Sequence, residues 1–235
     1  MDFADDPEKL NMLISAGKDF ELDGEDAWFV VAEDGSCALF DKECNIDDLS
    51  KVKTITEKMV RDDIKRINIP DSVTHIGYEA FAYCRSLKNI NIPDSVINIE
   101  RYAFSHCTSL TSINIPGSVT YIGEFAFFDC KFLKNIIIPD SVTSIGYFAF
   151  YACTSLKSII ISNSIEIIER YAFSHCESLT SINIPDSVNC IEYRAFYNCT
   201  SLEKVFFKGK TLEEVKSMDN YPWRIKDKST IVAEF

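Results

Sequence analysis

The sequence of 235 residues has no apolar run approaching the ~20 residues that a membrane-spanning helix needs. Its first ten residues, MDFADDPEKL, are acidic and no apolar stretch follows them, which is not the pattern of a secretory signal peptide. Membrane insertion is therefore not expected. Two locations stay open: the cytoplasm, or the cell surface or exterior if an export signal has been removed.

The sequence also lacks a basic segment. Residues 1–50 hold fifteen Asp and Glu against three Lys, a net charge of −12, while the remaining residues hold twenty-one acids and twenty-one bases. Proteins that bind nucleic acid or anionic membranes concentrate Lys and Arg on one surface. The charge distribution therefore predicts no nucleic-acid partner and indicates an acidic end on a neutral body.

Signatures of catalysis and metal binding are missing as well. No G-x-S-x-G, H-E-x-x-H, P-loop or dinucleotide fingerprint occurs, and the acidic stretch ELDGED lacks EF-hand spacing. His106 and His175 each precede a cysteine, but no CxxC or HxxxH partner accompanies them, so we expect solvated histidines on the outer side, not zinc ligands. An active site within residues 1–50 is the weaker alternative, because that segment has no histidine and no recognisable catalytic pair of acids. The sequence predicts no enzyme, metal or cofactor.

What the sequence does contain is one phrase of 19 residues, IPDSVTHIGYEAFAYCRSL at 69–87, repeated six times at a strict step of 23 residues. Alanine, phenylalanine and leucine each recur at a fixed place in the phrase, and so does one cysteine: Cys84, Cys107, Cys130, Cys153, Cys176 and Cys199. A fixed period of this length predicts a solenoid, in which each coil buries its apolar side only against its neighbours.

Each copy divides into parts that the spacing of its apolar residues predicts. In the second copy, Ile90 and Ile92 alternate as in a half-buried strand, and Pro93 ends that strand. The segment 95–99 fits a second short strand, and 103–107 has the spacing of about one helical turn. Eight residues of this coil are expected to be buried: Ile90, Ile92, Val96, Ile99, Ala103, Phe104, Cys107 and Leu110.

One place in the phrase alternates between glycine and glutamate. Glutamate rarely adopts a positive φ, so a place that also holds glutamate needs no special backbone conformation. We therefore expect glycine to be tolerated here and not required. The residues are Gly77, Gly123 and Gly146 against Glu100, Glu169 and Glu192.

The pattern Leu-x-x-Ile-x-Ile-Pro, followed by Ser-Val-x-x-Ile-Gly-x-x-Ala-Phe-x-x-Cys-x-Ser-Leu, resembles the BspA-like class of leucine-rich repeat proteins over residues 64–206. The resemblance implies an α/β repeat solenoid: a right-handed, curved stack of 23-residue coils with a parallel sheet along its concave side. It also implies a bacterial or protist surface protein that binds other proteins, host matrix components among them. Two departures, Ser162–Asn163 for Pro-Asp and Gly117 for Asp, are expected to leave the fold intact and to loosen the local turns.

Residues 51–207 form the predicted array, and 1–50 and 208–235 the predicted caps, since a solenoid must cover its terminal coils. In the first cap, Asp6 and Pro7 fit the start of a helix and Gly17 fits its end. The alternation of apolar residues over 27–41 predicts a hairpin. A strand over 67–69 would precede the first full phrase and bring the sheet to seven strands.

The C-terminal cap is expected to be helical. Thr211 and Glu214 fit a capping box for a short helix, and the bulky Tyr221, Pro222 and Trp223 are expected to cover the last coil.

The cysteines of the repeat are expected to be buried free thiols. Stacked coils bring their Cα atoms close, but their Cβ vectors run parallel instead of facing one another. Cys190 falls on the second strand. Cys37 and Cys44 lie in the first cap, where a bridge between them remains open.

The residues flanking the first inward apolar position of each strand point away from the core and form the candidate partner-binding surface. Most are short and polar, which costs little conformational entropy on binding. They are Arg66, Asn68, Asn89, Asn91, Ser112, Asn114, Asn135, Ile137, Ser158, Ile160, Ser181, Asn183, Lys204 and Phe206. Ile137 and Ile160 are apolar neighbours within this polar surface, which favours a contact patch, with mere support of strand packing as the alternative.

These observations predict a non-enzymatic, monomeric protein-binding module at the cell surface or secreted, adhesin-like, with a protein partner such as a host extracellular-matrix protein. An intracellular interaction scaffold is the alternative, favoured by the odd number of cysteines.

Overall fold

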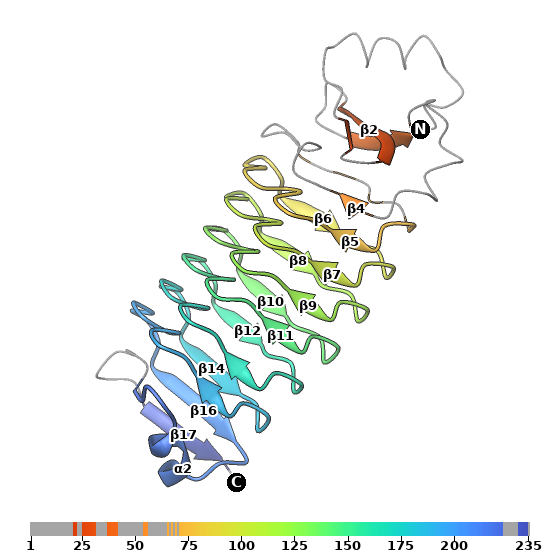
Figure 1. Cartoon of the computed structure of the whole chain (residues 1–235). Helices are drawn as coiled ribbons and strands as arrows, with labels where there is room; N and C mark the ends of the chain where they lie inside the picture. Colours follow the sequence, from red (N-terminus) through yellow and green to blue (C-terminus); the bar gives the residue numbers. More distant parts are fainter. Residues whose placement is uncertain are drawn as a thin grey trace.

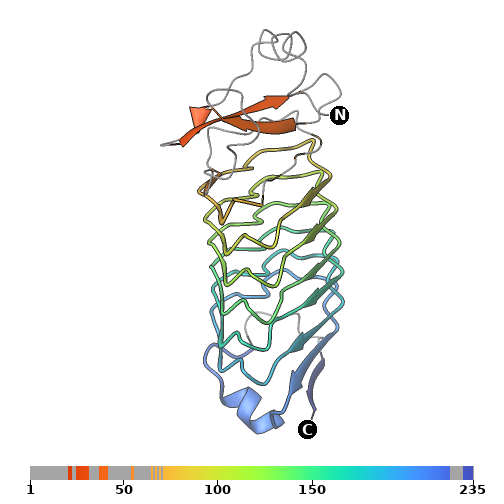
Figure 2. The same cartoon turned by 90° about the vertical axis from the view of Figure 1, so that its right-hand side faces the viewer.

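The computed structural model describes residues 21–22, 25–31, 37–41, 54–55, 65, 67, 69, 71–222 and 230–234. Over most of this length the chain is a parallel β-solenoid of about seven coils of roughly 23 residues, stacked as successive layers (Figures 1 and 2). The first to sixth coils are those that carry Cys84, Cys107, Cys130, Cys153, Cys176 and Cys199.

One file of strands follows the Ile-x-Ile part of each repeat. Its pairing is parallel, and partners lie one repeat apart, as in Asn89↔Ser112 and Asn135↔Ser158. The strands are β6 Asn89–Asn91, β8 Ser112–Asn114, β10 Asn135–Ile137, β12 Ser158–Ile160, β14 Ser181–Ile184 and β16 Lys204–Lys208. A seventh strand comes from the C-terminal end of the chain: β17 Thr230–Glu234 pairs parallel with β16. The expected strand over 67–69 is not assigned, although Ile67 and Ile69 are buried.

A second file of two-residue strands confirms the prediction made for 95–99. These strands also pair in parallel with a step of one repeat, as in Asn98↔Tyr121. They are β4 Thr54–Ile55, β5 His75–Ile76, β7 Asn98–Ile99, β9 Tyr121–Ile122, β11 Ser144–Ile145, β13 Ile167–Ile168 and β15 Cys190–Ile191. The Cys190 prediction is thereby confirmed.

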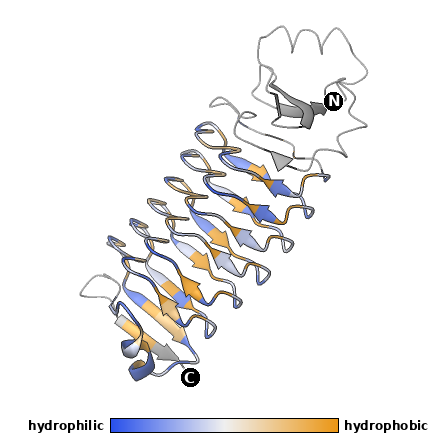
Figure 3. Ribbon diagram, viewed as in Figure 1, coloured by the Kyte–Doolittle hydropathy of each residue, from blue (hydrophilic) through white to orange (hydrophobic). Residues whose placement is uncertain are grey.

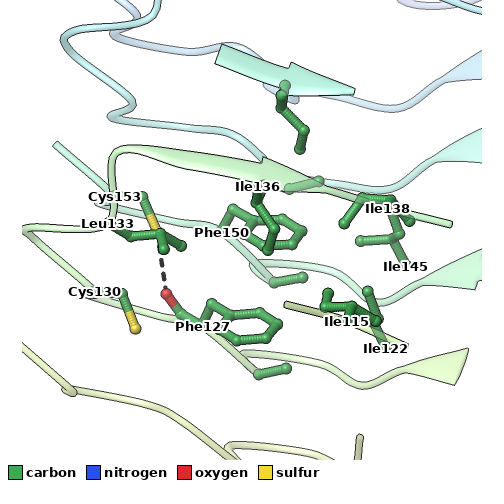
Figure 4. Packing of buried hydrophobic residues seen from close by; sticks show 14 of the residues in the cluster. Ile115, Ile122, Phe127, Cys130, Leu133, Ile136, Ile138, Ile145, Phe150 and Cys153 are labelled. Carbon is green, nitrogen blue, oxygen red and sulfur yellow. Dashed lines mark hydrogen bonds between the residues drawn. The ribbon is translucent and has the colours of Figure 1, made fainter. Parts of the chain in front are cut away.

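The core runs along the axis of the stack, because each repeat sends the same residues inward. All eight residues expected to be buried in the second coil are buried, and their counterparts in the other coils are buried with them. Figure 4 shows successive members of these files in contact, with the rings of Phe127 and Phe150 parallel and their centroids 5.2 Å apart. Figure 3 shows the resulting alternation of hydrophobic and hydrophilic residues along the strands.

The expected helical turn over 103–107 is wrong, and the array is a β-solenoid and not an α/β one. Tyr102 and His106 both have φ of 59°, in the left-handed region. Between them, hydrogen bonds alternate: Ser105 N–H donates within the coil to the Tyr102 carbonyl at 2.9 Å, while His106 N–H donates to the Phe128 carbonyl of the next coil at 2.7 Å. A helix would keep all these bonds within its own turn, whereas this segment uses half of them to hold the next coil.

The expectation that glycine is merely tolerated beside the second strand is wrong at two coils. The φ angle is not the cause, since neither glycine has a positive φ. A Cβ at Gly123 would lie 2.5 Å from the Glu100 carbonyl carbon, and a Cβ at Gly146 would lie 2.5 Å from the Glu124 nitrogen. Real Cβ atoms do not approach backbone so closely, so the tight packing of one coil on the next requires glycine here.

The Ser162–Asn163 departure changes the hydrogen bonding of its coil. The buried Ser162 hydroxyl donates to the Val142 carbonyl at 2.7 Å, and Asn163 N–H donates to the Asp140 carboxylate at 2.9 Å. The turn is thus tied to the preceding coil by side chains. Both strand ladders are nevertheless interrupted at this place, between β12 and β14 and between β11 and β13. At the other departure, Gly117, the turn keeps the hydrogen bond from the Ser118 hydroxyl to the Val96 carbonyl at 2.6 Å.

The N-terminal segment contains a three-stranded antiparallel sheet of β1 Glu21–Leu22, β2 Glu25–Val31 and β3 Cys37–Asp41. The hairpin expected over 27–41 is confirmed by the β2–β3 pairing, in which Ala27 faces Asp41. The helix expected between Asp6 and Gly17 lies outside the described residues.

At the C-terminal end, the helix α2 Leu212–Ser217 begins at Thr211 with the expected capping box: the Glu214 carboxylate accepts from Thr211 N–H, and Glu214 N–H donates to the Thr211 hydroxyl. Buried Val215 and partly buried Met218 and Ile231 pack on the core. Tyr221 and Pro222 are exposed and Trp223 lies outside the described residues, so the covering role expected of these three stays a prediction.

No helix in the described part of the chain is long and apolar enough to cross a membrane.

Candidate protein-binding surfaces

The strand face is formed by the outward residues of β6 to β16. Each three-residue strand has its central residue buried and both neighbours exposed, so the predicted orientation of Asn89 to Asn183 is confirmed. Lys204 is exposed and Phe206 is half-buried. Arg66 and Asn68 lie outside the described residues. The coil spacing therefore brings these side chains into two parallel rows, one on each side of the buried file.

One pair of polar residues on the strand face is joined across coils by a side-chain hydrogen bond. The Ser158 hydroxyl donates to the Asn135 side-chain oxygen at 2.9 Å, and their Cα atoms are register partners. This bond holds the two short side chains in one arrangement before any partner arrives. A surface of this kind loses little conformational entropy on binding.

Ile137 and Ile160 interrupt the polar rows. They are direct register partners on β10 and β12, and they are 61% and 59% exposed, so their side chains are not part of the core. The next register pair along the same row, Asn183 and Phe206, adds a half-buried ring. Ile137 and Ile160 thus make an apolar pair rimmed by asparagine and serine, and Asn183 separates this pair from Phe206.

A second surface, which the sequence analysis missed, lies on the turns that follow the second strand. Row A consists of aromatic rings stacked from coil to coil with centroids 4.6–4.8 Å apart: Tyr102, Phe125, Phe148 and Tyr171. Row B runs beside it with centroids 4.6–5.6 Å apart: Tyr83, His106, Phe128, Tyr151, His175 and Tyr197.

The rings of row B can be found in the sequence only if two adjacent positions of the repeat are considered together. In the second coil the ring is His106 and the residue before it is the small Ser105, whereas in the third coil the ring is Phe128 and Asp129 follows it. The dipeptides of the six coils are AY, SH, FD, YA, SH and YN. Each coil thus supplies one ring from either of two adjacent positions.

The expectation that the two histidines are simply solvated is wrong. The His106 ring stacks on Tyr83 with centroids 4.6 Å apart, and its Nδ1 lies 3.0 Å from the Asp129 carboxylate. The Nδ1 of His175 lies 3.0 Å from the side-chain nitrogen of Asn198. Both histidines therefore join neighbouring coils within row B. No cluster of three metal-ligating side chains occurs among the residues for which side chains are described.

The six repeat cysteines form one buried interior file of free thiols, as predicted. From Cys107 to Cys199, the Sγ atom of each cysteine in the file donates to a phenylalanine carbonyl of the preceding coil, as Cys153 does to Phe127 at 3.2 Å (Figure 4). Burial raises the pKa of the five thiols from Cys107 to Cys199, that of Cys199 to about 12, so these five stay protonated and unreactive. Cys190 is half-exposed, and partial burial together with the nearby Glu192 carboxylate raises its pKa. The Cys37 and Cys44 side chains lie outside the described part of the chain.

Comparison with solved structures supports the fold. The leucine-rich repeat protein of T. pallidum is 25% identical to the chain, covers 77% of it over 90% of its own length, and superposes with a TM-score of 0.62. A leucine-rich repeat protein of Bacteroides ovatus is 23% identical, covers 92% of the chain over 79% of its own length, and gives a TM-score of 0.53. No curated protein sequence matches the chain.

The model of the BspA-type leucine-rich repeat region, with six copies, matches residues 53–154 and 120–221. These ranges span both strand files from β4 to β16, and with them most of the sequence. Repeat folds of this kind are protein-interaction modules whose stacked coils present extended surfaces. The chain belongs to the BspA-type leucine-rich repeat family.

Proposed function

We propose that the protein is a non-enzymatic binding module that recognises another protein through its strand face. The observation that carries this proposal is the exposed register pair Ile137 and Ile160 within a face of mainly short polar side chains. Exposed apolar neighbours rimmed by polar groups are the usual arrangement at the centre of a protein–protein contact.

The rigidity of the stack supports this role. Successive coils are joined by two strand ladders, which are interrupted only between β12 and β14 and between β11 and β13 in the described part of the chain, and by the turn bonds beyond the second strand. The strand face therefore keeps its shape when it binds, and the residues that vary among coils determine which partner fits.

The finer parts of the proposal follow from the family resemblance. The protein acts as a monomeric, adhesin-like molecule at the cell surface or after secretion, the strand face is the concave side of a right-handed stack, and the partner is an extracellular protein such as a host matrix component. An intracellular scaffold is the second candidate, favoured by the odd number of cysteines in the sequence. Antibody labelling of intact against lysed cells separates the two locations.

The test of the strand face is the double variant Ile137→Asp with Ile160→Asp. We expect it to keep the melting temperature, because both side chains are exposed, and to weaken binding to purified extracellular-matrix proteins in biolayer interferometry by at least about tenfold.

The matched control is Ile97→Asp with Ile167→Asp. These isoleucines are 43% and 44% exposed; Ile97 directly precedes β7 and Ile167 is the outward residue of β13, so the variant introduces the same charge at the second strand file. Equal weakening by both double variants would show a charge effect and contradict a site on the strand face. A large loss of melting temperature in the first variant would place the pair in the core.

A further inference from the structure

A cavity of about 460 Å³ opens between row A and row B at the first three coils. We call it the turn slot. Ala82 and Ser105 lie between the two rows, and Glu79 and Arg101 complete the lining. The rings along its two sides are Tyr78, Tyr102 and Phe125, and Tyr83, His106 and Phe128.

The slot exists because of where row B takes its rings. In the third and fourth coils the ring comes from the position nearer row A, and the rows touch: Phe125–Phe128 centroids lie 5.7 Å apart and Phe148–Tyr151 centroids 5.4 Å apart. In the first two coils that position is occupied by Ala82 and Ser105, which are too small to fill the gap. The opening is therefore built into the sequence of two particular coils.

Two polar groups of the slot can donate to a ligand: the Ser105 hydroxyl and the Arg101 guanidinium. Ser105 is only 2% exposed, yet its hydroxyl makes no hydrogen bond with any other described residue. Its counterpart in the fifth coil, Ser174, donates to the Tyr197 carbonyl at 2.9 Å. The Arg101 side chain is 50% exposed, contacts the Glu124 carboxylate through Nε at 3.4 Å and donates from Nη2 to the Tyr102 hydroxyl at 3.5 Å. Its guanidinium carbon lies 5.0 Å from the centroid of the Tyr102 ring, and the remaining guanidinium N–H groups can donate to a ligand.

We propose that the turn slot binds a polyproline II segment of a partner protein. Proline-rich segments are apolar and carry carbonyl acceptors without N–H donors, so they match a slot with aromatic walls and donor groups. Their preformed conformation also lowers the entropy lost on binding. This site lies on the turns and not on the strand face, and it is independent of the function proposed above.

The repeat of the slot fits the repeat of this ligand. Ring centroids lie 4.6 Å apart from Tyr83 to His106 and 5.3 Å apart from His106 to Phe128. Two coils therefore advance by about 10 Å, close to the ~9.3 Å of one polyproline II turn of three residues. Two prolines three residues apart would therefore span the slot from the first coil to the third.

The direct test is fluorescence anisotropy of a fluorescein-labelled oligoproline of twelve residues, with a Gly-Ser peptide of equal length as the reference. We expect saturable binding of the oligoproline alone. In the variant Ser105→Tyr with His106→Ala, the second coil acquires the Tyr-Ala dipeptide of the fourth coil, which fills the slot with a ring that the fold already accepts. The affinity should fall about tenfold or more.

The fifth coil provides the matched control, because it carries the same Ser-His-Cys sequence away from the slot. The variant Ser174→Tyr with His175→Ala should bind oligoproline like the unmodified protein, and so should Ile137→Asp with Ile160→Asp. A third variant, Ser105→Ala, repeats the alanine of the first coil and should fold in any case. Loss of its hydroxyl should weaken binding about two- to tenfold.

Three results would overturn the proposal. The first is no saturable oligoproline binding by the unmodified protein, and the second is equal effects of the second-coil and fifth-coil variants. The third is full affinity in both Ser105→Ala and the slot-filling variant Ser105→Tyr with His106→Ala. Capture of an oligosaccharide on a glycan array without oligoproline binding would assign the slot to another class of ligand. Failure of the strand-face test would leave these outcomes unchanged.

Discussion

The file of phenylalanines offers a quantitative test of how coils stabilise one another. Phe127 is fully buried, and its ring is stacked between Phe104 and Phe150 with centroids 5.3 and 5.2 Å away. Emptying a buried aromatic site costs about 3–5 kcal/mol, and each ring pair contributes about 0.5–1.5 kcal/mol beyond the buried area. Phe127→Ala should therefore lower the free energy of unfolding by a value near the upper end, about 5 kcal/mol.

The same change at the end of the file gives the comparison. Phe196 is equally buried but stacks on one described ring, Phe173, at 5.7 Å. Phe196→Ala should cost about 1 kcal/mol less than Phe127→Ala, the worth of one ring pair. The exposed Phe132 serves as control, and Phe132→Ala should change stability by no more than about 0.5 kcal/mol.

Urea denaturation followed by circular dichroism measures all three variants, and constant m-values show that the same cooperative unit unfolds each time. A cost below about 2 kcal/mol for Phe127→Ala, smaller than any usual loss of a buried aromatic side chain, would refute the stacking argument.

Two further predictions concern the close approach of coils and the buried thiols. Gly123→Ala should cost about 1–3 kcal/mol because its Cβ would overlap the Glu100 backbone, while Gly117→Ala, with open space around it, should be neutral in the same urea titration; equal effects would contradict the close approach. Burial raises the pKa of Cys107, Cys130, Cys153 and Cys176, whereas thiols of the unfolded chain ionise near pH ~8.5. Because the unfolded chain then binds fewer protons, the free energy of unfolding should be fully present below that pH and should fall above it, by up to about 1.4 kcal/mol per pH unit for each thiol. A flat profile between pH 8 and pH 10 would show that the thiols ionise in the folded protein too.

The sequence predicted the inward files because their columns hold an apolar residue in every coil. A residue such as Phe104 or Cys107 has the same neighbours in every coil, so its burial follows from the period alone. The outward direction of the strand face followed from the same alternation.

The turns could not be predicted in this way. The apolar spacing at Ala103, Phe104 and Cys107 suits a helical turn, but it also suits a chain that alternates bonds within the coil and to the next coil. The second solution places non-glycine residues such as Tyr102 at positive φ, which local propensity disfavours and only a stacked neighbour stabilises.

Row B on the turns and the strand β17 at the C-terminal end were not predicted, for related reasons. The rings of row B alternate between adjacent positions, so a column-by-column comparison of Ser105, His106, Phe128 and Asp129 shows no constant residue. The strand β17 lies outside the repeat and pairs with β16 only through tertiary contact. Only the assembled structure shows either feature.

The most direct test of in-register stacking is labelling of individual cysteines by iodoacetamide, mapped by mass spectrometry of peptides from the native and the denatured protein. The account predicts that the cysteines of the interior file stay unlabelled in the native protein, that the half-exposed Cys190 is labelled, and that all of these react after denaturation. Native labelling of Cys107, Cys130 or Cys153 in the middle of the file would contradict the register on which every surface described above depends.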